Sequence, residues 1–212
     1  VRNGLLTGET TQDIAKRLTG KLQLGQTGSV KQIAEAGGQA TIAANNQVMT
    51  LVRTSINQVA NAASQQVYEA NQDITKKYRY TATLDTRTSA ICRALDGQEF
   101  PYGKGPTPPQ HFNCRSTTVP VIDYKELGFT PPLPGRRASM DGPVPANTTY
   151  GQWLKEQSFS VKAEVLGKEK VRYFDLLSEK YGPQKALAKL VSTDGSELTL
   201  DQLRKRYGAS DS

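Results

Sequence analysis

The chain has 212 residues, of which 36% are apolar and 22% charged, and its 27 basic and 20 acidic side chains give a formal charge of +7. No run approaches the roughly 20 apolar residues that a spanning helix needs, and no apolar segment follows a basic start, so we expect neither a membrane span nor a secretory signal. Two cysteines exclude a disulfide framework, and a reducing cytoplasm is the expected compartment.

A short amphipathic helix is predicted over residues 9–24. Thr10 and Asp13 resemble a capping box at its start, and Gly25 and Gly28 interrupt the pattern at its end. Apolar residues recur at every fourth position between these signals, at Ile14, Leu18 and Leu22.

The strongest helical pattern in the sequence lies between residues 39 and 71. This stretch contains no Gly or Pro. Its apolar residues are spaced by 3, 4 or 7 positions, at Ile42, Met49, Val52, Ile56, Val59, Ala63 and Val67. We predict one long helix over 39–71. Its other faces carry Asn, Gln, Ser and Thr with few charges, so we expect them to lie against neighbouring helices or other chains.

A period-two pattern typical of a half-buried strand follows the long helix. Apolar and polar residues alternate there, with Tyr78, Tyr80, Ala82 and Leu84 set between Lys77, Arg79, Thr81 and Thr83. Two shorter strands are predicted at 98–100, after an Asp-Gly turn signal, and at 117–122, where Pro120 suits an edge position. The Gly- and Pro-rich segment 103–109 predicts an irregular loop. We expect the strands to form a small antiparallel sheet packed on the long helix.

The last third of the chain changes composition twice. Residues 128–147 hold five prolines and three glycines beside Arg136 and Arg137, which predicts an extended linker or strap. Five short helices are predicted after it, at Tyr150–Gln157, Val161–Leu166, Lys168–Lys180, Pro183–Val191 and Leu200–Tyr207. The predicted fold class is α+β, with a core over 1–127, the linker over 128–147 and a small helical lobe over 148–212.

Both cysteines and the only histidine fall in one segment, with the spacing Cys92-x18-His111-x2-Cys114. Crowding of these soft ligands is what a structural zinc site needs, although such a site takes four ligands and this group supplies three. A pair of free buried thiols beside a hydrogen-bonded histidine is the alternative. The spacing leaves both interpretations open.

Two runs around this cluster resemble a known family. LDTRTSAICRALDGQEFP and PPQHFNCRSTTVPV are similar to the signature of the Mu F-like minor head proteins of tailed bacteriophages, a head-morphogenesis family in which Asp-x-Arg-Thr-Cys-x-x-Cys, Leu-Asp-Gly and Pro-Pro-x-His-x-Asn-Cys-Arg-Cys recur. The long helix, with its Arg-Thr pair at 53–54, and the closing TYGQWLKEQ, EVLGKEK and LTLDQLRKR also resemble the family. Besides Cys92, His111 and Cys114, the matching positions are Asp85, Arg87, Thr88, Asp96, Gly97, Asn113 and Arg115.

The chain departs from the family pattern at two positions, Ser89 and Ser116, which stand where the pattern has its first and last cysteines. Loss of two thiolates suggests a hydrogen-bonded remnant, in which Asp96, Arg87 and Arg115 tie the loops by charge-assisted bonds. A solvated face is the alternative role for the arginines. We predict that the cluster mainly fixes loops and holds zinc weakly or not at all.

The resemblance implies a structural virion protein, present in few copies, that associates with the portal and the capsid interior during head assembly and contacts packaged DNA. The expected partners are the portal protein, other capsid proteins and double-stranded DNA, with no membrane and no small-molecule substrate. The expected location is the capsid interior near the portal, after assembly in the host cytoplasm. We expect no enzymatic activity.

Two other functions stay open on the residues alone. A histidine and cysteines beside a hairpin and a helix are also found in HNH-like metal-dependent nucleases, yet that chemistry normally needs a second histidine or an acidic ligand, and the chain has one histidine. A non-specific DNA-binding module is the other alternative, because 16 basic against 11 acidic residues lie in 1–146. Its candidate phosphate contacts are Lys76, Lys77 and Arg79, with Arg87, Arg93 and Arg115 nearby.

Overall fold

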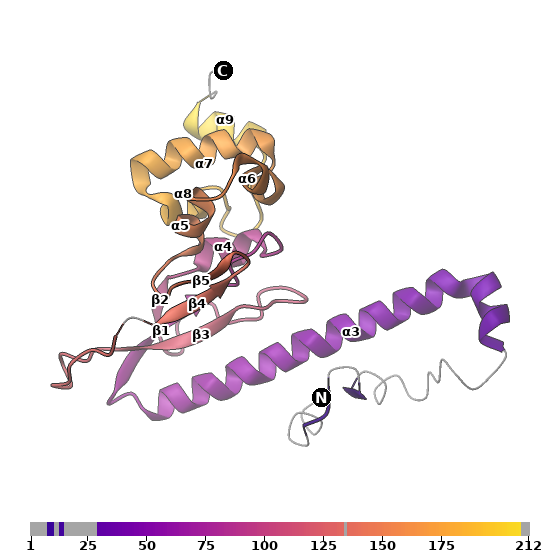
Figure 1. The fold of residues 1–212 in the computed structure, drawn as a ribbon, viewed down its shortest axis with the longest axis horizontal. Coiled ribbons are helices and arrows are strands. Elements are labelled where there is room, and N and C mark those ends of the chain that lie inside the picture. The colour runs from indigo at the N-terminus through magenta and orange to yellow at the C-terminus, as the bar shows by residue number, and fades with distance from the viewer. Residues whose placement is uncertain (1–7, 11–12, 15–28, 134, 209–212) are drawn as a thin grey trace.

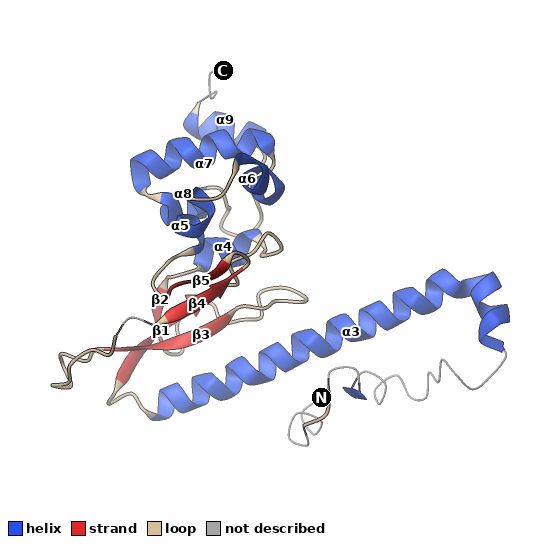
Figure 2. Cartoon of the chain, in the orientation of Figure 1, coloured by secondary structure: helices blue, strands red, loops and turns tan. Residues whose placement is uncertain are grey.

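One long helix and an upright body of small sheets and short helices make up the chain in a computed structural model, which describes residues 8–10, 13–14, 29–133 and 135–208 (Figure 1). The strands are antiparallel and, apart from one short helix at 90–95, follow one another in the chain between the long helix and the C-terminal helices, which is an α+β fold (Figure 2). Most of the helix predicted over 9–24 lies outside the described residues. At its start, the Asp13 N–H donates to Thr10 Oγ1 at 3.2 Å, which is the contact expected of a capping box.

The long helix, α3, runs from Ser29 to Ala70 and has 42 residues. The predicted end is correct to one residue, but the predicted start at 39 is wrong by ten. The helix continues through Gly37 and Gly38, because each glycine costs a helix only about 1 kcal/mol relative to alanine and does not remove a backbone donor. At 1.5 Å per residue the helix is about 63 Å long. No described helix has both the length and the apolar character needed to cross a bilayer.

Three strands form the antiparallel sheet beside α3, in the order β2-β1-β3. They are β1 (Thr75–Thr81), β2 (Glu99–Pro101) and β3 (Thr117–Ile122). The prediction for β3 is confirmed in both bounds, and Pro120 lies on an edge strand as expected, because β3 pairs only with β1. Between β1 and β2 lies the short helix α4 (Ala90–Leu95), which was not predicted from periodicity.

The alternation predicted around the first strand is confirmed by burial. Tyr78, Tyr80, Ala82 and Leu84 are all buried. The strand itself ends at Thr81, and Leu84 makes only an isolated bridge to Ser139. The period-two pattern therefore extends past the last hydrogen-bonded residue of β1, because burial continues there against the C-terminal helices.

The linker or strap predicted over 128–147 contains regular structure in its second half. Residues 128–133 contain no helix or strand, but β4 (Arg136–Ser139) and β5 (Gly142–Pro145) form an antiparallel hairpin. Gly142, with φ 110°, supplies the left-handed conformation that follows the turn. The prolines of β5 are tolerated because each strand of a two-stranded sheet is an edge.

All five predicted C-terminal helices are confirmed. They are α5 (Tyr150–Lys155), α6 (Phe159–Leu166), α7 (Lys168–Tyr181), α8 (Pro183–Lys189) and α9 (Leu200–Tyr207). Capping boxes begin α5 at Thr149 and α9 at Thr199. Their shared core includes Trp153, Phe174 and Leu84, so the helical lobe packs directly on the chain that leaves the first sheet.

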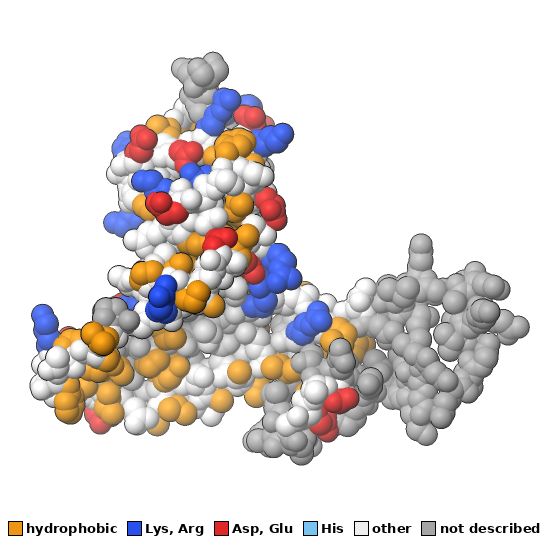
Figure 3. All heavy atoms as spheres, viewed as in Figure 1, with side chains coloured by type: hydrophobic (Ala, Val, Ile, Leu, Met, Phe, Trp, Pro, Cys, Tyr) orange, Lys and Arg blue, Asp and Glu red, His pale blue; other side chains and the backbone are white. Residues whose placement is uncertain are grey.

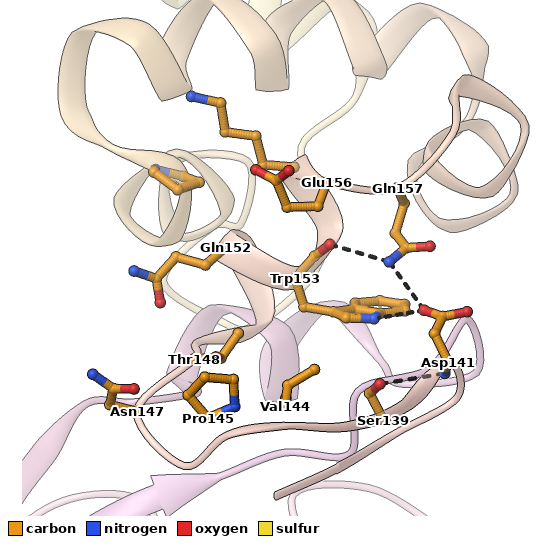
Figure 4. Close-up of a pocket in the computed structure, with 12 residues that line it drawn as sticks. Ser139, Asp141, Val144, Pro145, Asn147, Thr148, Gln152, Trp153, Glu156 and Gln157 are labelled. Atoms are coloured by element: carbon orange, nitrogen blue, oxygen red, sulfur yellow. Dashed lines mark hydrogen bonds between the residues drawn. The ribbon is translucent and has the colours of Figure 1, made fainter. Parts of the chain in front are cut away.

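The β4–β5 hairpin closes on α5 at a pocket of about 530 Å³ (Figure 4). Asp141 lies at the edge of the Trp153 ring and accepts the indole N–H at 3.0 Å. The Gln157 amide donates to the same carboxylate oxygen at 3.0 Å. These bonds fasten the hairpin to the lobe, and none of the described residues lining the pocket is Cys or His.

Polar residues of α3, not its apolar stripe, face the sheet. The Asn57 amide donates to the Ser116 carbonyl at 3.0 Å, and the Gln65 amide donates to the Thr118 hydroxyl at 3.0 Å. The face expected to meet other helices or chains therefore contacts this chain's own sheet. The apolar stripe points elsewhere, with Val52 buried against Ile14 and Val67 60% exposed.

Candidate functional site

Cys92, His111 and Cys114 meet at one point, as the sequence predicted. Cys92 lies on α4, and the other two lie on the loop between β2 and β3. The two Sγ atoms are 3.7 Å apart, and Cys92 Sγ is 3.3 Å from His111 Nε2. Their potential ligand atoms all fall within 4.8 Å of one another.

The loop that carries His111 and Cys114 is held in place by α3. Asn113 adopts φ 57°, a left-handed conformation that asparagine tolerates better than most residues. In that conformation its N–H donates to Thr54 Oγ1 at 3.0 Å, and its side-chain amide donates to Thr50 Oγ1 at 3.2 Å. Asn113, which was predicted as a motif residue, thus binds the loop to the long helix.

The two thiols form one acid–base pair. A hydrogen bond with Cys114, together with burial, raises the pKa of Cys92, and the same bond lowers the pKa of Cys114. The Tyr80 hydroxyl lies 3.1 Å from Cys92 Sγ, and burial raises the pKa of this phenol, so it stays protonated.

The donor set fits three corners of a zinc site. With Zn–S bonds of about 2.3 Å and Zn–N bonds of about 2.0 Å, tetrahedral geometry places two sulfurs about 3.8 Å apart and sulfur and nitrogen about 3.5 Å apart. The two distances from Cys92 Sγ, 3.7 Å to Cys114 Sγ and 3.3 Å to His111 Nε2, are close to these edges. Ser89 and Ser116 line a cavity of about 20 Å³ with Cys92 and His111, where further thiolates would stand. Among the described residues the buried Ser89 hydroxyl has no hydrogen-bond partner.

Replacement of Cys92 by Ala tests whether the cluster fixes the loops. We expect Cys92→Ala to lower the free energy of unfolding by about 1–3 kcal/mol, because it removes a buried thiol and leaves the polar groups of Tyr80 and His111 facing a gap. Urea unfolding with elemental analysis of protein purified without chelator measures both effects. One tightly held zinc per wild-type chain, with unfolding on chelation, would contradict a loop-fixing remnant.

Asp85, Arg115, Arg87 and Thr88 form a second group beside the cluster. Arg115 donates to both oxygens of Asp85 at 2.5 and 2.7 Å, and the Thr88 hydroxyl donates to the same carboxylate at 3.1 Å. Burial opposes ionisation, yet the Arg115 and Thr88 hydrogen bonds and the Arg115 charge lower the pKa of Asp85. Arg87 lies 3.8 Å from Asp85 with its side chain 80% exposed.

Asp96 and Gly97 belong to a different centre, which joins the sheet, the hairpin and the lobe. Asp96 is fully buried and accepts backbone N–H groups from Ala82 at 2.7 Å and Tyr150 at 2.6 Å. Its ionic partner is Arg137, at 3.0 and 3.1 Å. Asp96 and Arg115 thus both form the charge-assisted bonds that were expected of them, but with different partners: Asp96 with Arg137, and Arg115 with Asp85.

Arg137 is the residue of this centre that sequence reasoning missed. Arg137 appeared only as part of a dibasic pair in a linker, although the burial of Asp96 requires a cationic partner. Gly97, with φ 78°, turns the chain so that its N–H donates to the Tyr80 carbonyl at 2.8 Å. A side chain at Gly97 would collide with Thr149, at 2.8 Å from an added Cβ.

Several basic residues proposed to contact DNA are already paired. Lys76 pairs with Glu126 at 2.5 Å, and Arg79 pairs with Glu99 at 2.8 Å. Arg93 is buried, donates to the Val165 carbonyl at 2.8 Å and pairs with Glu197. Its inclusion among the surface phosphate contacts is wrong, because it anchors α4 to the lobe. Lys77 is exposed and forms no ion pair with another described residue.

Comparison with known proteins connects the first half of the chain to one family. Residues 1–119 match the family model described as phage Mu protein F like protein. An uncharacterized protein of Haemophilus influenzae is 40% identical over 55 residues, which make up 24% of this chain. The chain covers 12% of that relative's own length. No solved structure matches the chain.

Proposed function

The chain belongs to the phage Mu protein F like family, and from this premise we propose that it is a structural minor head protein of a tailed bacteriophage. Membership makes it a phage head-related protein, with virion location and capsid-related partners. The proposal adds that it associates with the portal at the capsid interior and contacts packaged DNA there. It acts in head assembly and catalyses no reaction.

The hydrogen bonds that the motif side chains form within the chain support a structural role. Asp85 forms its hydrogen bonds with Arg115. Asp96 accepts hydrogen bonds from Arg137 and two backbone N–H groups, and Asn113 donates to a side chain of α3. Each of these three side chains thus joins two segments that are distant in sequence. Such internal pairing suits a part that must hold its shape within an assembly, and it leaves these groups unavailable for substrate.

The state of His111 argues against a nuclease. A general base must present a free ring nitrogen to water. His111 Nδ1 lies 2.8 Å from the Phe112 carbonyl and Nε2 lies 3.3 Å from Cys92 Sγ, so both nitrogens are engaged. Within the described residues, the group of potential metal ligands around it contains no carboxylate. The arrangement therefore favours a structural cluster over an HNH-like site.

The location of the chain in the particle tests the proposed function. We expect a peptide tag placed after the C-terminus to sediment with purified heads and to appear, by affinity-labelled cryo-electron microscopy, inside the capsid at the portal vertex. Procapsids without DNA should contain the same amount, because incorporation precedes packaging. A tagged chain that stays in the soluble fraction of an infected lysate, or that labels every capsid vertex equally, would overturn the proposal.

A further inference from the structure

An open groove of about 670 Å³ separates α3 from the loop that carries the Cys and His cluster. Its described lining residues include three arginines and two asparagines and no carboxylate: Arg53, Ile56, Asn57, Ala60, Arg87, Asn113, Cys114 and Arg115. Figure 3 shows Lys and Arg side chains gathered in the angle where the upright body meets the long helix. The groove therefore presents positive charge from two separate elements to one space.

Most of the positive charge in this groove is not neutralised by ion pairs with carboxylates. Arg53 is exposed and forms no ion pair with any described residue. Arg87 is 80% exposed and lies 3.8 Å from its nearest carboxylate, that of Asp85. Asp85 is chelated by Arg115 at 2.5 and 2.7 Å. The three guanidinium groups that line the groove therefore stand against this one carboxylate beside Arg87 and Arg115. A net positive charge is left at the groove wall.

The surface predicted from sequence to contact DNA has less free charge. Lys76 and Arg79 are each paired with a glutamate at 2.5 and 2.8 Å. Only Lys77 of that trio lacks such a pair among the described residues. Neutralisation of phosphates requires unpaired cations, because each paired carboxylate must first be displaced. The groove is thus the better site for a polyanion.

The groove is also preformed. Asn113 ties the loop to Thr50 and Thr54 of α3, and the Asn57 amide ties α3 to the Ser116 carbonyl at 3.0 Å. These bonds fix the distance between the arginine on the helix and those on the loop segments. Preorganised donors lose less conformational freedom when a ligand binds, and guanidinium groups match phosphate geometry.

We propose that this groove binds the phosphodiester backbone of double-stranded DNA, with Arg53 and Arg87 contacting phosphates and Arg115 held in place by Asp85. The inference rests on the proposed function, which supplies DNA as the abundant polyanion inside the head. It names the surface that makes the contact. Phosphate contacts carry no sequence information, so binding is independent of base sequence and weakens as salt rises.

Duplex binding by the full chain tests the groove. Anisotropy of a labelled 30-base-pair duplex is measured at several salt concentrations for the wild type, the groove variant Arg53→Gln/Arg87→Gln and the control variant Lys76→Gln/Arg79→Gln. The groove variant should bind on the order of tenfold more weakly at low salt, with its salt slope reduced by about 2, because two phosphate contacts are lost. The control should stay within about twofold of the wild type. All four side chains are at least partly exposed, so thermal unfolding checks that each variant folds.

The results of this experiment distinguish failure of the groove proposal from failure of the proposed function. Wild-type binding that the groove variant retains and the control variant loses would overturn the groove and leave DNA contact standing. No wild-type binding at low salt would overturn both the groove and DNA contact, while the location in the particle is decided independently. Binding of poly-glutamate in place of the duplex, lost in the groove variant, would overturn the inference in favour of an acidic protein segment.

Discussion

Replacement of Asp96 by Asn should lower the free energy of unfolding by about 3–5 kcal/mol. The side chain is fully buried and accepts two backbone N–H groups as well as both terminal nitrogens of Arg137. An asparagine of the same size removes the negative charge and turns an N–H₂ group toward donors. Arg137, whose side chain is 13% exposed, is left as an uncompensated buried cation.

Equilibrium unfolding in urea, followed by tryptophan fluorescence, measures this loss, since Trp153 lies in the lobe that Asp96 joins to the sheet. Asp73→Asn is the matched control, because Asp73 is exposed, and it should change stability by less than about 0.5 kcal/mol. Equal effects of the two substitutions would show that Asp96 does not hold the three parts together.

Replacement of Ser89 by Cys should create a tight zinc site. Ser89 precedes Cys92 by three residues at the start of α4 and lines the same small cavity as Cys92 and His111. A thiolate there completes a Cys3His set, the closed arrangement of structural zinc. With zinc at about a thousandfold above the dissociation constant, the variant should gain about 4 kcal/mol of stability over its metal-free form.

Elemental analysis after gel filtration should find one zinc per chain in the Ser89→Cys variant, and chelation should reverse the stabilisation. Ser178→Cys is the matched control, because Ser178 is also buried without a hydrogen-bond partner among the described residues but lies in α7 of the lobe. It should bind no additional zinc. A Ser89→Cys variant with the metal content of the control would show that the fourth corner is not within reach.

Local signals predicted those helices and strands whose boundaries depend on residues adjacent in the sequence. Three of the five C-terminal helices follow a residue whose side chain caps the helix, namely Thr149, Ser158 and Thr199. Strand β3 was predicted in both bounds, because alternation and Pro120 describe an edge strand without reference to its partners. The boundaries of such elements are determined by a few adjacent residues, so they can be found from one sequence.

Pairing between distant segments could not be predicted in the same way. Asp96 and Arg137 are 41 residues apart, and nothing local distinguishes Arg137 from its exposed neighbour Arg136. The β4–β5 hairpin was hidden because proline and glycine predict an extended chain whether or not two strands pair. Convergence of Cys92, His111 and Cys114 was predicted from their crowding in one segment and from the family resemblance, and not from periodicity.

The orientation of α3 shows a limit of hydrophobic patterning. An apolar stripe predicts which face of a helix is buried, on the assumption that the nearest partner is apolar. Here Asn57, Gln65 and Tyr68 hydrogen-bond to Ser116 and Thr118 instead. Hydrogen bonds require matched donors and acceptors at fixed positions, which the composition of one helix face cannot specify.

The polar interface also means that α3 is fixed at one end and projects from the body at the other. Residues 50–68 are clamped by hydrogen bonds to the sheet and its loop, whereas residues 29–49 project beyond the body (Figure 1). The overhang follows about 30 Å of helix axis and bends near its N-terminal end (Figure 1), and a tilt of about 10° at the clamp displaces its tip by several ångströms. A slip of one residue would rotate the helix by about 100° and break every clamp bond at once. The hydrogen bonds at the sheet therefore set the position of a point several nanometres away.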